Sequence, residues 1–433
     1  MNTTCKPGKA VYVVDGLRTP FLKARGEAGP FSSSDLATWA GRALLLRQPF
    51  KPDQLDQVIL GSVLPGADEV NIARLVALRM GCGHGMPAWT VQRNCASGLQ
   101  AIDSAIKEIQ SGSSHLILAG GVDAMSRAPL QLKQVMADWL FNWSRQIDWR
   151  QKLRQLGRLT LGHFMPVVTL LKGLNDPMVD LSMGQTAEII SHEMGISRQQ
   201  MDQWAMQSHH RLAQAQEKGW LGEEITPLFD PLGKLLERDD GLYPDSSMEK
   251  LSRLSPAFDR PAGRVTAGNS AQITDGAAWV LLADEEGMIR HGLTPIAKVY
   301  PAVWAGVDPA RMGLGPVHAI ARLLQRHGLV VPEVNLWEIN EAFAGQVLAC
   351  VTALADDNYC RRELALEFSP GKIPLQDLNA EGGAISIGHP VGASGARLIL
   401  HLSQALQRTG HHMGVASLCI GGGQGGAMLL EAV

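Results

Sequence analysis

Cys95 lies where a strand-like run meets a helical pattern. Trp89 to Val91 has the character of a short strand, and residues 96–109 repeat apolar side chains at helical spacing until Ser111-Gly112. The sulfur is therefore expected at a helix N-terminus, where free N–H groups and the helix dipole favour a thiolate. The pattern predicts a nucleophile, against the commoner alternative of a buried structural cysteine.

A glycine-dense segment, 382–397, carries His389 and runs into a second helical pattern with an apolar face. Glycine permits positive φ and close backbone approach, which a loop needs in order to hold an imidazole against a ligand. His389 is thus either a proton acceptor or an ordinary loop histidine bonded to its neighbours.

Two further segments place polar groups beside turns. Cys419 precedes a polyglycine turn, 421–426, whose N–H groups, including that of Gly421, can form an oxyanion hole. This turn formally satisfies GxGxxG, but the seven residues after it are too few for the rest of a dinucleotide fold. Asn340 heads another helical pattern, where it is either a site amide or a plain N-cap.

The composition is that of an ordinary globular protein and gives no sign of a nucleic-acid binder: 433 residues, 45% hydrophobic, 19% charged, net charge -3. Six cysteines without a CxxC pair predict neither a disulfide framework nor a zinc site and favour a reducing compartment. The N-terminal segment has no long apolar run and its first arginine is Arg18, so we expect a cytoplasmic protein. No window reaches the ~20 consecutive apolar residues of a membrane-spanning helix.

Strand-like and helical runs alternate along most of the chain, which predicts an α/β fold with sheets covered on both faces. Residues 128–258 lack apolar strand runs and are rich in tryptophan and basic residues, so we expect an insertion there. The chain also suggests an internal duplication. Asn94-Cys95-Ala96 is echoed by Asn340-Glu341-Ala342, and the segment 115–125 by the segment 412–428.

Five segments together resemble the thiolase family in order and spacing: VQRNCASGLQAI, VTAGNSAQITDGAA, NEAFAGQ, GGAISIGHPVGASGAR and CIGGGQGGA. The resemblance covers nearly the whole chain. It implies a duplicated fold of two stacked βαβ-type halves in five layers, α-β-α-β-α, with an inserted loop domain. The implied boundaries are 1–127 and 259–290 for the N-terminal half, 128–258 for the inserted loop domain, and 291–433 for the C-terminal half.

The resemblance also assigns roles to single residues. It implies that Cys95 accepts the acyl group, that His389 takes the Cys95 proton, and that Cys419 handles the α-proton of acetyl-CoA. Asn340 is implied to hold a water that, with His389, stabilises the enolate oxygen. The N–H groups of Cys95 and Gly421 are implied to receive the acyl oxyanion.

Contacts with coenzyme A are implied near Ser270 and Ala271. Many short-chain relatives place an arginine and a serine against coenzyme A where this chain has Tyr243 and Ala271, so we expect the contacts to differ here. Coenzyme A and acyl-CoA enter as substrates. By the same resemblance, neither a metal nor a permanently bound cofactor is required.

The implied activity is thiolytic cleavage of 3-ketoacyl-CoA in fatty-acid β-oxidation. Within the family the chain is most similar to the thiolase subunit of fatty-acid oxidation complexes, although such relatives often carry histidine in place of Asn340. The alternatives are the reverse Claisen condensation of two acetyl-CoA molecules, a ketoacyl synthase, and a non-catalytic acyl-CoA or lipid carrier. Cys419 argues against a synthase, which normally lacks a second catalytic cysteine. Chain length and direction stay open.

The resemblance implies a homodimer or homotetramer, with a hydratase/dehydrogenase subunit as a further partner and no nucleic acid. Within the insertion, the stretch 139–158 interleaves tryptophan and phenylalanine with arginine and lysine. Such a stretch can rest on an anionic membrane surface or dock a partner subunit. The alternative is a solvated helix that covers an active-site loop.

Overall fold

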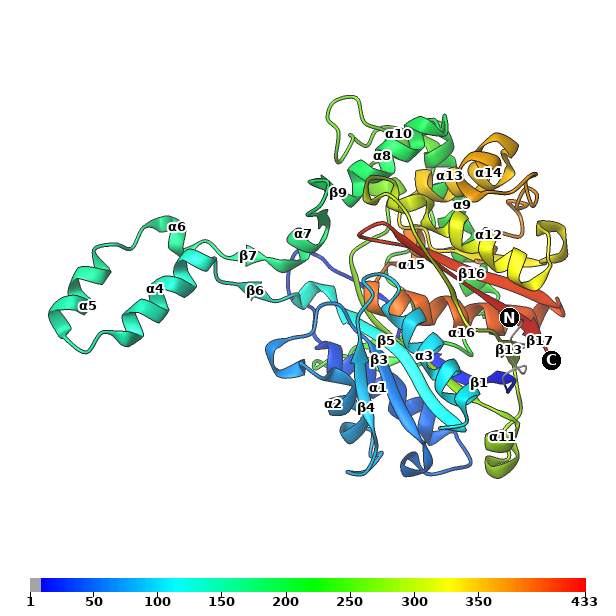
Figure 1. Cartoon of the computed structure of the whole chain (residues 1–433), viewed down its shortest axis with the longest axis horizontal. Helices are drawn as coiled ribbons and strands as arrows, with labels where there is room; N and C mark the ends of the chain where they lie inside the picture. Colours follow the sequence, from blue (N-terminus) through cyan, green and yellow to red (C-terminus); the bar gives the residue numbers. More distant parts are fainter. Residues whose placement is uncertain (1–8) are drawn as a thin grey trace, which may run out of the picture.

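Two long helices, α3 (Ser97–Ser111) and α16 (Val391–Thr409), pack against each other at the centre of the molecule (Figure 1). The computed structural model describes residues 9–433. Residues 1–8 lie outside the described part, and with them the start of the N-terminal segment on which the expected cytoplasmic location rests. α3 ends at Gly112 in the left-handed conformation. Its apolar side chains share one buried face, as the sequence pattern predicts: Leu99, Ile102, Ile106 and Ile109.

The first half of the chain forms one side of the central sheet. The strands lie in the order β4 (Ala88–Val91), β3 (Gln57–Gly61), β5 (Leu116–Ala124), β12 (Thr274–Ala283) and β1 (Val11–Arg18). β3 pairs in parallel with both of its neighbours, whereas β12 runs antiparallel to β5 and to β1. The short β2 (Leu22–Lys23) also pairs with β12.

The second half repeats this plan. β15 (Leu336–Ile339) pairs in parallel with β16 (Met413–Ile420), which pairs antiparallel with β17 (Gln424–Ala432). β13 (Ala297–Val299) and β14 (Val303–Gly306) both pair with β17. β13 also pairs with β1, so the two halves share one continuous sheet.

The sheet wraps around the central helices, and further helices cover its outer faces. One apolar cluster holds α3 and α16 between strands of both halves. A second cluster packs α1 (Ser33–Leu46) and α2 (Ile72–Arg79) on the first half, and a third packs α12 (Gly315–His327) and α13 (Ala344–Ala355) on the second. The expected five-layer α/β arrangement is confirmed.

The strand pairing also corrects one expected internal match. β5 and β16 each follow a central helix and lie between a parallel and an antiparallel neighbour, which confirms the match of 115–125 with 412–428. The match of Asn94 with Asn340 is wrong. Asn94 precedes the central helix α3, whereas Asn340 follows β15, the counterpart of β3. The counterpart of the Cys95 segment is therefore the His389 segment before α16.

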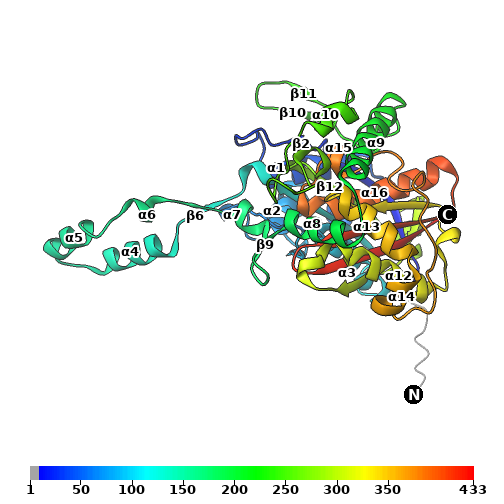
Figure 2. The ribbon, with the colours of Figure 1, turned by 90° about the horizontal axis from the view of Figure 1, so that it is seen from above.

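Residues 128–258 contain two kinds of structure. α8 (Met183–Glu193) and α9 (Arg198–Glu217) pack on α13 over the second half. By contrast, residues 130–168, here named the arm, project away from the body in both views (Figures 1 and 2). The arm runs from β6 to β7 through three helices: β6 (Leu130–Gln131), α4 (Gln134–Arg145), α5 (Trp149–Leu156), α6 (Leu161–Phe164) and β7 (Val167–Val168). The domain boundaries given above stay a prediction.

Buried charges tie this region to α16. Glu224 accepts a hydrogen bond from Arg18 Nε at 2.9 Å, and its other oxygen lies 3.0 Å from His401 Nδ1. On the other side, Arg397 donates to Glu338 at 3.0 Å, and His401 Nε2 lies 3.9 Å from the same carboxylate. All five side chains are buried. Such charges persist away from water only when they are paired, so the cluster fixes α16 against β1, β15 and the insertion.

The remaining elements are short: α7 (Thr169–Gly173), β8 (Asn175–Asp176), β9 (Leu181–Ser182), β10 (Leu228–Phe229), β11 (Leu235–Leu236), α10 (Met248–Ser252), α11 (Glu285–His291), α14 (Asp357–Leu364) and α15 (Ala384–Ile387). Across residues 9–433, no helix is both long and apolar enough to cross a bilayer.

Candidate active site

The chain turns sharply between β4 and α3, and Cys95 stands in that turn. Asn94 adopts a left-handed φ of 44°, a conformation that asparagine tolerates better than most residues. The Ser97 hydroxyl closes the turn: it accepts a hydrogen bond from Arg93 N at 2.8 Å and donates to Asn94 O at 2.7 Å. Cys95 is thereby held two residues before the first turn of α3.

The electrostatic surroundings of Cys95 differ from the expectation. The sequence predicts a thiolate, but burial raises the pKa of the Cys95 thiol above its usual value. The N–H groups of Gly421 and of Cys95 itself act on the sulfur in the opposite direction without overcoming burial. The resting group is therefore a thiol that needs a base when it attacks.

His389 stands in the same place in the second half, two residues before α16. Gly388 precedes it with φ 110°, and a Cβ there would lie 2.3 Å from a Thr274 side-chain atom, so only glycine fits. The backbone N–H of His389 donates to the backbone carbonyl of Gln272 at 3.1 Å. These contacts set the imidazole against the first half.

Hydrogen bonds decide which imidazole nitrogen accepts a proton. Nδ1 of His389 lies 2.6 Å from Ser394 Oγ, and that hydroxyl donates to Pro390 O at 3.0 Å. Nδ1 must therefore carry the hydrogen and donate to Ser394, which leaves Nε2 with a lone pair. Burial, together with Arg397, lowers the pKa of His389 to about 4. A neutral imidazole with a free Nε2 is the form that can take a proton from a thiol.

Asn340 touches this nitrogen from the end of β15. Its Nδ2 lies 3.5 Å from His389 Nε2, a long contact that leaves the lone pair only weakly engaged. Asn340 is fully buried, and its Oδ1 has no partner among the described residues. A buried amide oxygen of this kind is a ready acceptor for a donor on substrate or solvent.

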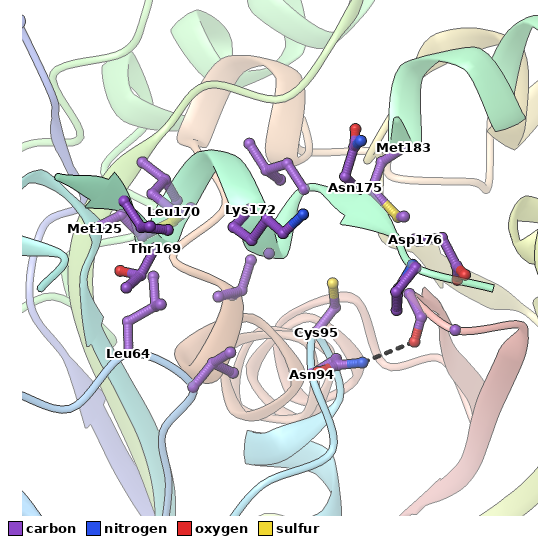
Figure 3. A pocket seen from close by; sticks show the side chains of 18 of the residues that line it. Leu64, Asn94, Cys95, Met125, Thr169, Leu170, Lys172, Asn175, Asp176 and Met183 are labelled. Atoms are coloured by element: carbon purple, nitrogen blue, oxygen red, sulfur yellow. Dashed lines mark hydrogen bonds between the residues drawn. The ribbon is translucent and has the colours of Figure 1, made fainter. Parts of the chain in front are cut away.

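Cys419 and Gly421 come from the end of β16 and the turn that follows it. Gly422 and Gly423 have φ of 90° and 80°, so the turn to β17 needs glycine. The Asn94 side chain donates to Gly421 O at 2.8 Å, which joins this turn to the Cys95 turn (Figure 3). Burial raises the pKa of Cys419 well above its usual value, and the neighbouring Cys95 acts in the same direction. Cys419 is thus a protonated thiol beside Cys95.

A cavity with two lobes surrounds Cys95. Its histidine lobe, about 340 Å³, is lined by Cys95, His389, Cys419 and Gly421. Its arm lobe, about 580 Å³, extends from Cys95 past Leu64 to the root of the arm. Figure 3 shows this second lobe, with the Cys95 sulfur pointing into it and α7 lying across from that sulfur. The lobes share seven residues: Cys95, Met125, Leu174, Asn175, Met183, Val391 and Gly421.

The two residues predicted to contact coenzyme A line the histidine lobe. Ala271 N donates to Ala342 O at 3.0 Å, and the Ser270 hydroxyl donates to Thr266 O at 2.7 Å. Tyr243 does not line either lobe; its ring lies under the Lys23 ammonium at 4.7 Å, and half of its surface is exposed.

Sequence reasoning missed several residues of the site. The histidine lobe is walled mainly by apolar side chains from five separate segments: Met125, Met183, Phe258, Met312 and Phe343. Asp123 was also missed. It accepts hydrogen bonds from Leu64 N at 2.9 Å and Gly392 N at 2.7 Å, which joins the arm lobe to the start of α16. Ser394 was missed as well, although it lies only five residues after His389 in the same glycine-dense segment.

Comparison with known proteins identifies the family. The models "Thiolase, N-terminal domain" and "Thiolase, C-terminal domain" match residues 11–286 and 293–432. The chain therefore belongs to the thiolase family.

Individual members of this family are similar to the chain over nearly its full length. The mitochondrial 3-ketoacyl-CoA thiolase of Rattus norvegicus is 35% identical over 427 residues, 98% of each chain. The crystal structure of human mitochondrial 3-ketoacyl-CoA thiolase in complex with CoA is similar with a TM-score of 0.83 and 34% identity, covering 98% of each chain. The acetyl-CoA acetyltransferase of Bacillus anthracis has a TM-score of 0.85 and 35% identity, covering 98% of this chain and 99% of that chain.

Proposed function

We propose that this thiolase cleaves 3-ketoacyl-CoA with free coenzyme A, giving acetyl-CoA and a shortened acyl-CoA, as a step of fatty-acid β-oxidation. Membership of the family makes it an acyl-CoA acyltransferase, and relatives over the full length are named 3-ketoacyl-CoA thiolases. The assignment of catalytic roles to single residues rests on one observation: the same cavity is lined by Cys95, His389, Cys419 and Gly421.

The first step is attack by sulfur on the 3-keto carbon. Cys95 gives its proton to His389 Nε2, the nitrogen left free by the Ser394 hydrogen bond, as the carbon–sulfur bond forms. Negative charge then develops on the keto oxygen. The N–H groups of Cys95 and Gly421, which act on the sulfur in the resting site, are in place to stabilise it.

The second step breaks the bond between C2 and C3 and releases acetyl-CoA as an enolate. Cys419, whose thiol burial keeps protonated, delivers a proton to C2. Asn340 and His389 stabilise the enolate oxygen, Asn340 through a bound water. Coenzyme A finally attacks the acyl-Cys95 thioester and gives its thiol proton to the Cys419 thiolate. His389 returns its proton to the Cys95 sulfur, so that Cys95 leaves as the thiol and the site is restored.

Coenzyme A and acyl-CoA are substrates in this scheme. Their pantetheine chain lies in the histidine lobe along Ser270 and Ala271. This lobe is lined mainly by apolar side chains and includes Cys95 in its lining. The human relative was solved in complex with CoA. No permanently bound cofactor takes part in any step.

A thiolysis assay over short, medium and long 3-ketoacyl-CoA substrates, with a Cys95→Ser variant beside the wild type, tests this function. We expect turnover by the wild type and at least about a thousandfold loss in the variant, the scale on which removal of a catalytic nucleophile acts. Mass spectrometry after mixing with acetyl-CoA should show acetylated Cys95. An unmodified Cys95 would identify a non-catalytic carrier, and near-normal turnover by the variant would overturn its assignment.

Condensation of two acetyl-CoA molecules to acetoacetyl-CoA is the second candidate, because the chain is also similar to a protein named acetyl-CoA acetyltransferase. The same residues serve both directions, since a catalyst accelerates a reaction both ways. Comparing kcat/KM for acetoacetyl-CoA with that for longer substrates separates the two. A preference for acetoacetyl-CoA favours condensation.

We further propose that the protein acts in the cytoplasm as a homodimer or homotetramer, and that a hydratase/dehydrogenase subunit is its partner. Such a subunit would produce the 3-ketoacyl-CoA that this site consumes. Cell fractionation and sedimentation of the purified protein, alone and mixed with that subunit, test these proposals. A monomer that sediments unchanged in the mixture contradicts both forms of assembly.

A further inference from the structure

The arm has no core of its own. Every residue from 126 to 175 keeps at least part of its surface exposed, although the segment is rich in large apolar side chains. Four strongly exposed ones lie on or beside α4 and α5: Phe141 at 57%, Ile147 at 99%, Trp149 at 66% and Leu153 at 60%. Removing such apolar surface from water lowers the free energy. Within residues 9–433 nothing covers these side chains, so they are available to a partner surface.

Charge separates the arm from the rest of the molecule. Residues 130–168 hold six lysines and arginines against two aspartates, a net charge of +4, whereas the whole chain carries -3. The remainder is therefore at -7. A second copy of this chain would meet the arm either with its own arm, whose equal positive charge repels it, or with its body, whose negative charge attracts it. An anionic lipid surface supplies both negative headgroups and an apolar layer beneath them.

The helix α5 has the arrangement that an interfacial helix needs. Trp149, Leu153 and Leu156 recur at helical spacing and are exposed, and the residues between them include Arg150, Lys152 and Arg154. Arg150 lies over the Trp149 ring at 5.6 Å, and Lys152 over the Trp143 ring at 6.0 Å. Tryptophan rings with adjacent cations are typical of segments that rest at the level of lipid headgroups.

We propose that the arm is a docking element for anionic membranes, which binds through the exposed apolar face and the cations of α4 and α5. The root of the arm walls the active-site cavity, because Gln131 of β6 and Val167 of β7 line the arm lobe together with Cys95. Docking through the arm thus tethers this cavity to the lipid surface through β6 and β7. The inference rests on the proposed function only for the reason to dock: a long-chain acyl-CoA substrate is itself an amphiphile that partitions to such surfaces.

Co-sedimentation of the full-length protein with vesicles tests the proposal. The vesicles contain either phosphatidylcholine mixed with phosphatidylglycerol, or phosphatidylcholine alone. We expect binding to the mixed vesicles, weaker binding at high salt, and at least about tenfold weaker binding after Arg150→Gln, Lys152→Gln, Arg154→Gln and Arg158→Gln are combined, because each basic residue adds to the attraction. Trp149→Ala should also weaken binding at unchanged charge.

The matched control neutralises four exposed cations of the body, Arg42, Lys234, Arg326 and Lys372, and should leave vesicle binding unchanged. Equal losses in both variants, or equal binding to both kinds of vesicle, would overturn the proposal. A change in oligomeric state of the arm variant without a change in vesicle binding would show that a second copy occupies the arm. Thiolysis of a short substrate by the same samples reports separately on folding and on the proposed function.

Discussion

The central helices α3 and α16 hold equivalent places in the two halves, yet their surroundings differ. α3 buries an apolar face and a single acid, Asp103, whereas α16 is buried along most of its length and encloses Arg397 and His401. The insertion explains the difference, because Glu224 reaches α16 and supplies a partner for His401. Duplication thus fixed the geometry of the two helices, and the insertion changed the electrostatics of one of them.

The N-termini of the same helices show a second difference. One presents a thiol, Cys95, and the other an imidazole, His389, and burial shifts both groups toward their neutral forms by raising one pKa and lowering the other. A resting pair of neutral groups can exchange a proton during attack without first breaking an ion pair. The comparison predicts that each helix loses a distinct property when its own residues change.

The largest effect is expected from His389→Gln, which removes the proton acceptor at the head of α16. We expect kcat to fall by roughly a hundred- to ten-thousandfold, the contribution typical of a general base. The rate at which acetyl-CoA acetylates Cys95, followed by mass spectrometry, should fall in parallel. His411→Gln, an exposed histidine just beyond α16, is the control. Unchanged acetylation would assign the base to another group.

The next effect concerns stability rather than activity. His401→Gln leaves the Glu224 carboxylate without one of its two cationic partners, and we expect the free energy of unfolding to fall by about 3–5 kcal/mol, as for other broken buried pairs. Urea unfolding followed by circular dichroism measures it. A loss within experimental error would mean that the cluster is not what ties the insertion to α16.

The same cluster of buried charges makes the free energy of unfolding depend on pH. Burial alone would lower the pKa of His401, but Glu224 and the nearby Glu381 and Glu338 raise it to about 9. Because this lies above the unfolded value of about 6.5, the stabilisation is complete below that pH and is lost as the pH rises through about 9, on the order of 3 kcal/mol. Unfolding at both pH values should show this loss in the wild type and not in His401→Gln.

A smaller effect is expected where the two helices touch. A Cβ at Gly395 of α16 would lie 2.4 Å from Leu99 N of α3, so Gly395→Ala must push the helices apart. We expect a loss of about 1–3 kcal/mol, as for other overpacked cores, together with reduced thiolysis. Thermal unfolding compares it with Gly162→Ala in the arm, where the nearest atom is 3.7 Å away and no loss is expected. Equal stability of both variants would contradict the close approach.

The smallest effect belongs to Ser394→Ala, which removes the partner of His389 Nδ1. Loss of one hydrogen bond of about 0.5–1.5 kcal/mol predicts a fall of roughly two- to tenfold in kcat, with KM nearly unchanged. Ser403→Ala removes a similar hydroxyl, which donates to Ile399 O at 2.7 Å on the same helix, and should leave kcat as it is. Identical kinetics of the two variants would remove Ser394 from the site.

The sequence predicted the fold and the site unequally. Regular features were predictable: the apolar face of α3, the glycine turns around His389 and Cys419, and the exposed character of the arm follow from spacing and composition. The match of Asn94 with Asn340 failed because two shared residue types, an asparagine and an alanine, cannot distinguish a central helix from an outer one. Strand pairing, which is a property of the whole sheet, was needed to decide it.

The protonation of the site was beyond the sequence for a related reason. The position of Cys95 before a helix was predicted correctly, but its pKa depends on burial by segments far away in the chain, among them the one that carries Met183 and the turn at Gly421. In the same way, Phe258 and Met312 bear no motif. Phe258 belongs to the insertion and Met312 to the second half, so the two line one cavity only because the insertion folds back over that half.

The pairing of β1 with β13 carries a consequence for any attempt to separate the halves. The two halves of the sheet meet through the paired segments Val11 to Val13 and Ala297 to Val299, and both segments are largely buried. Cutting the chain in the connection before β13 and isolating either fragment would bare a row of unsatisfied amides on an apolar border, which is the kind of surface that aggregates. The halves are therefore expected to be obtainable as soluble fragments only by co-expression, each acting as the other's chaperone.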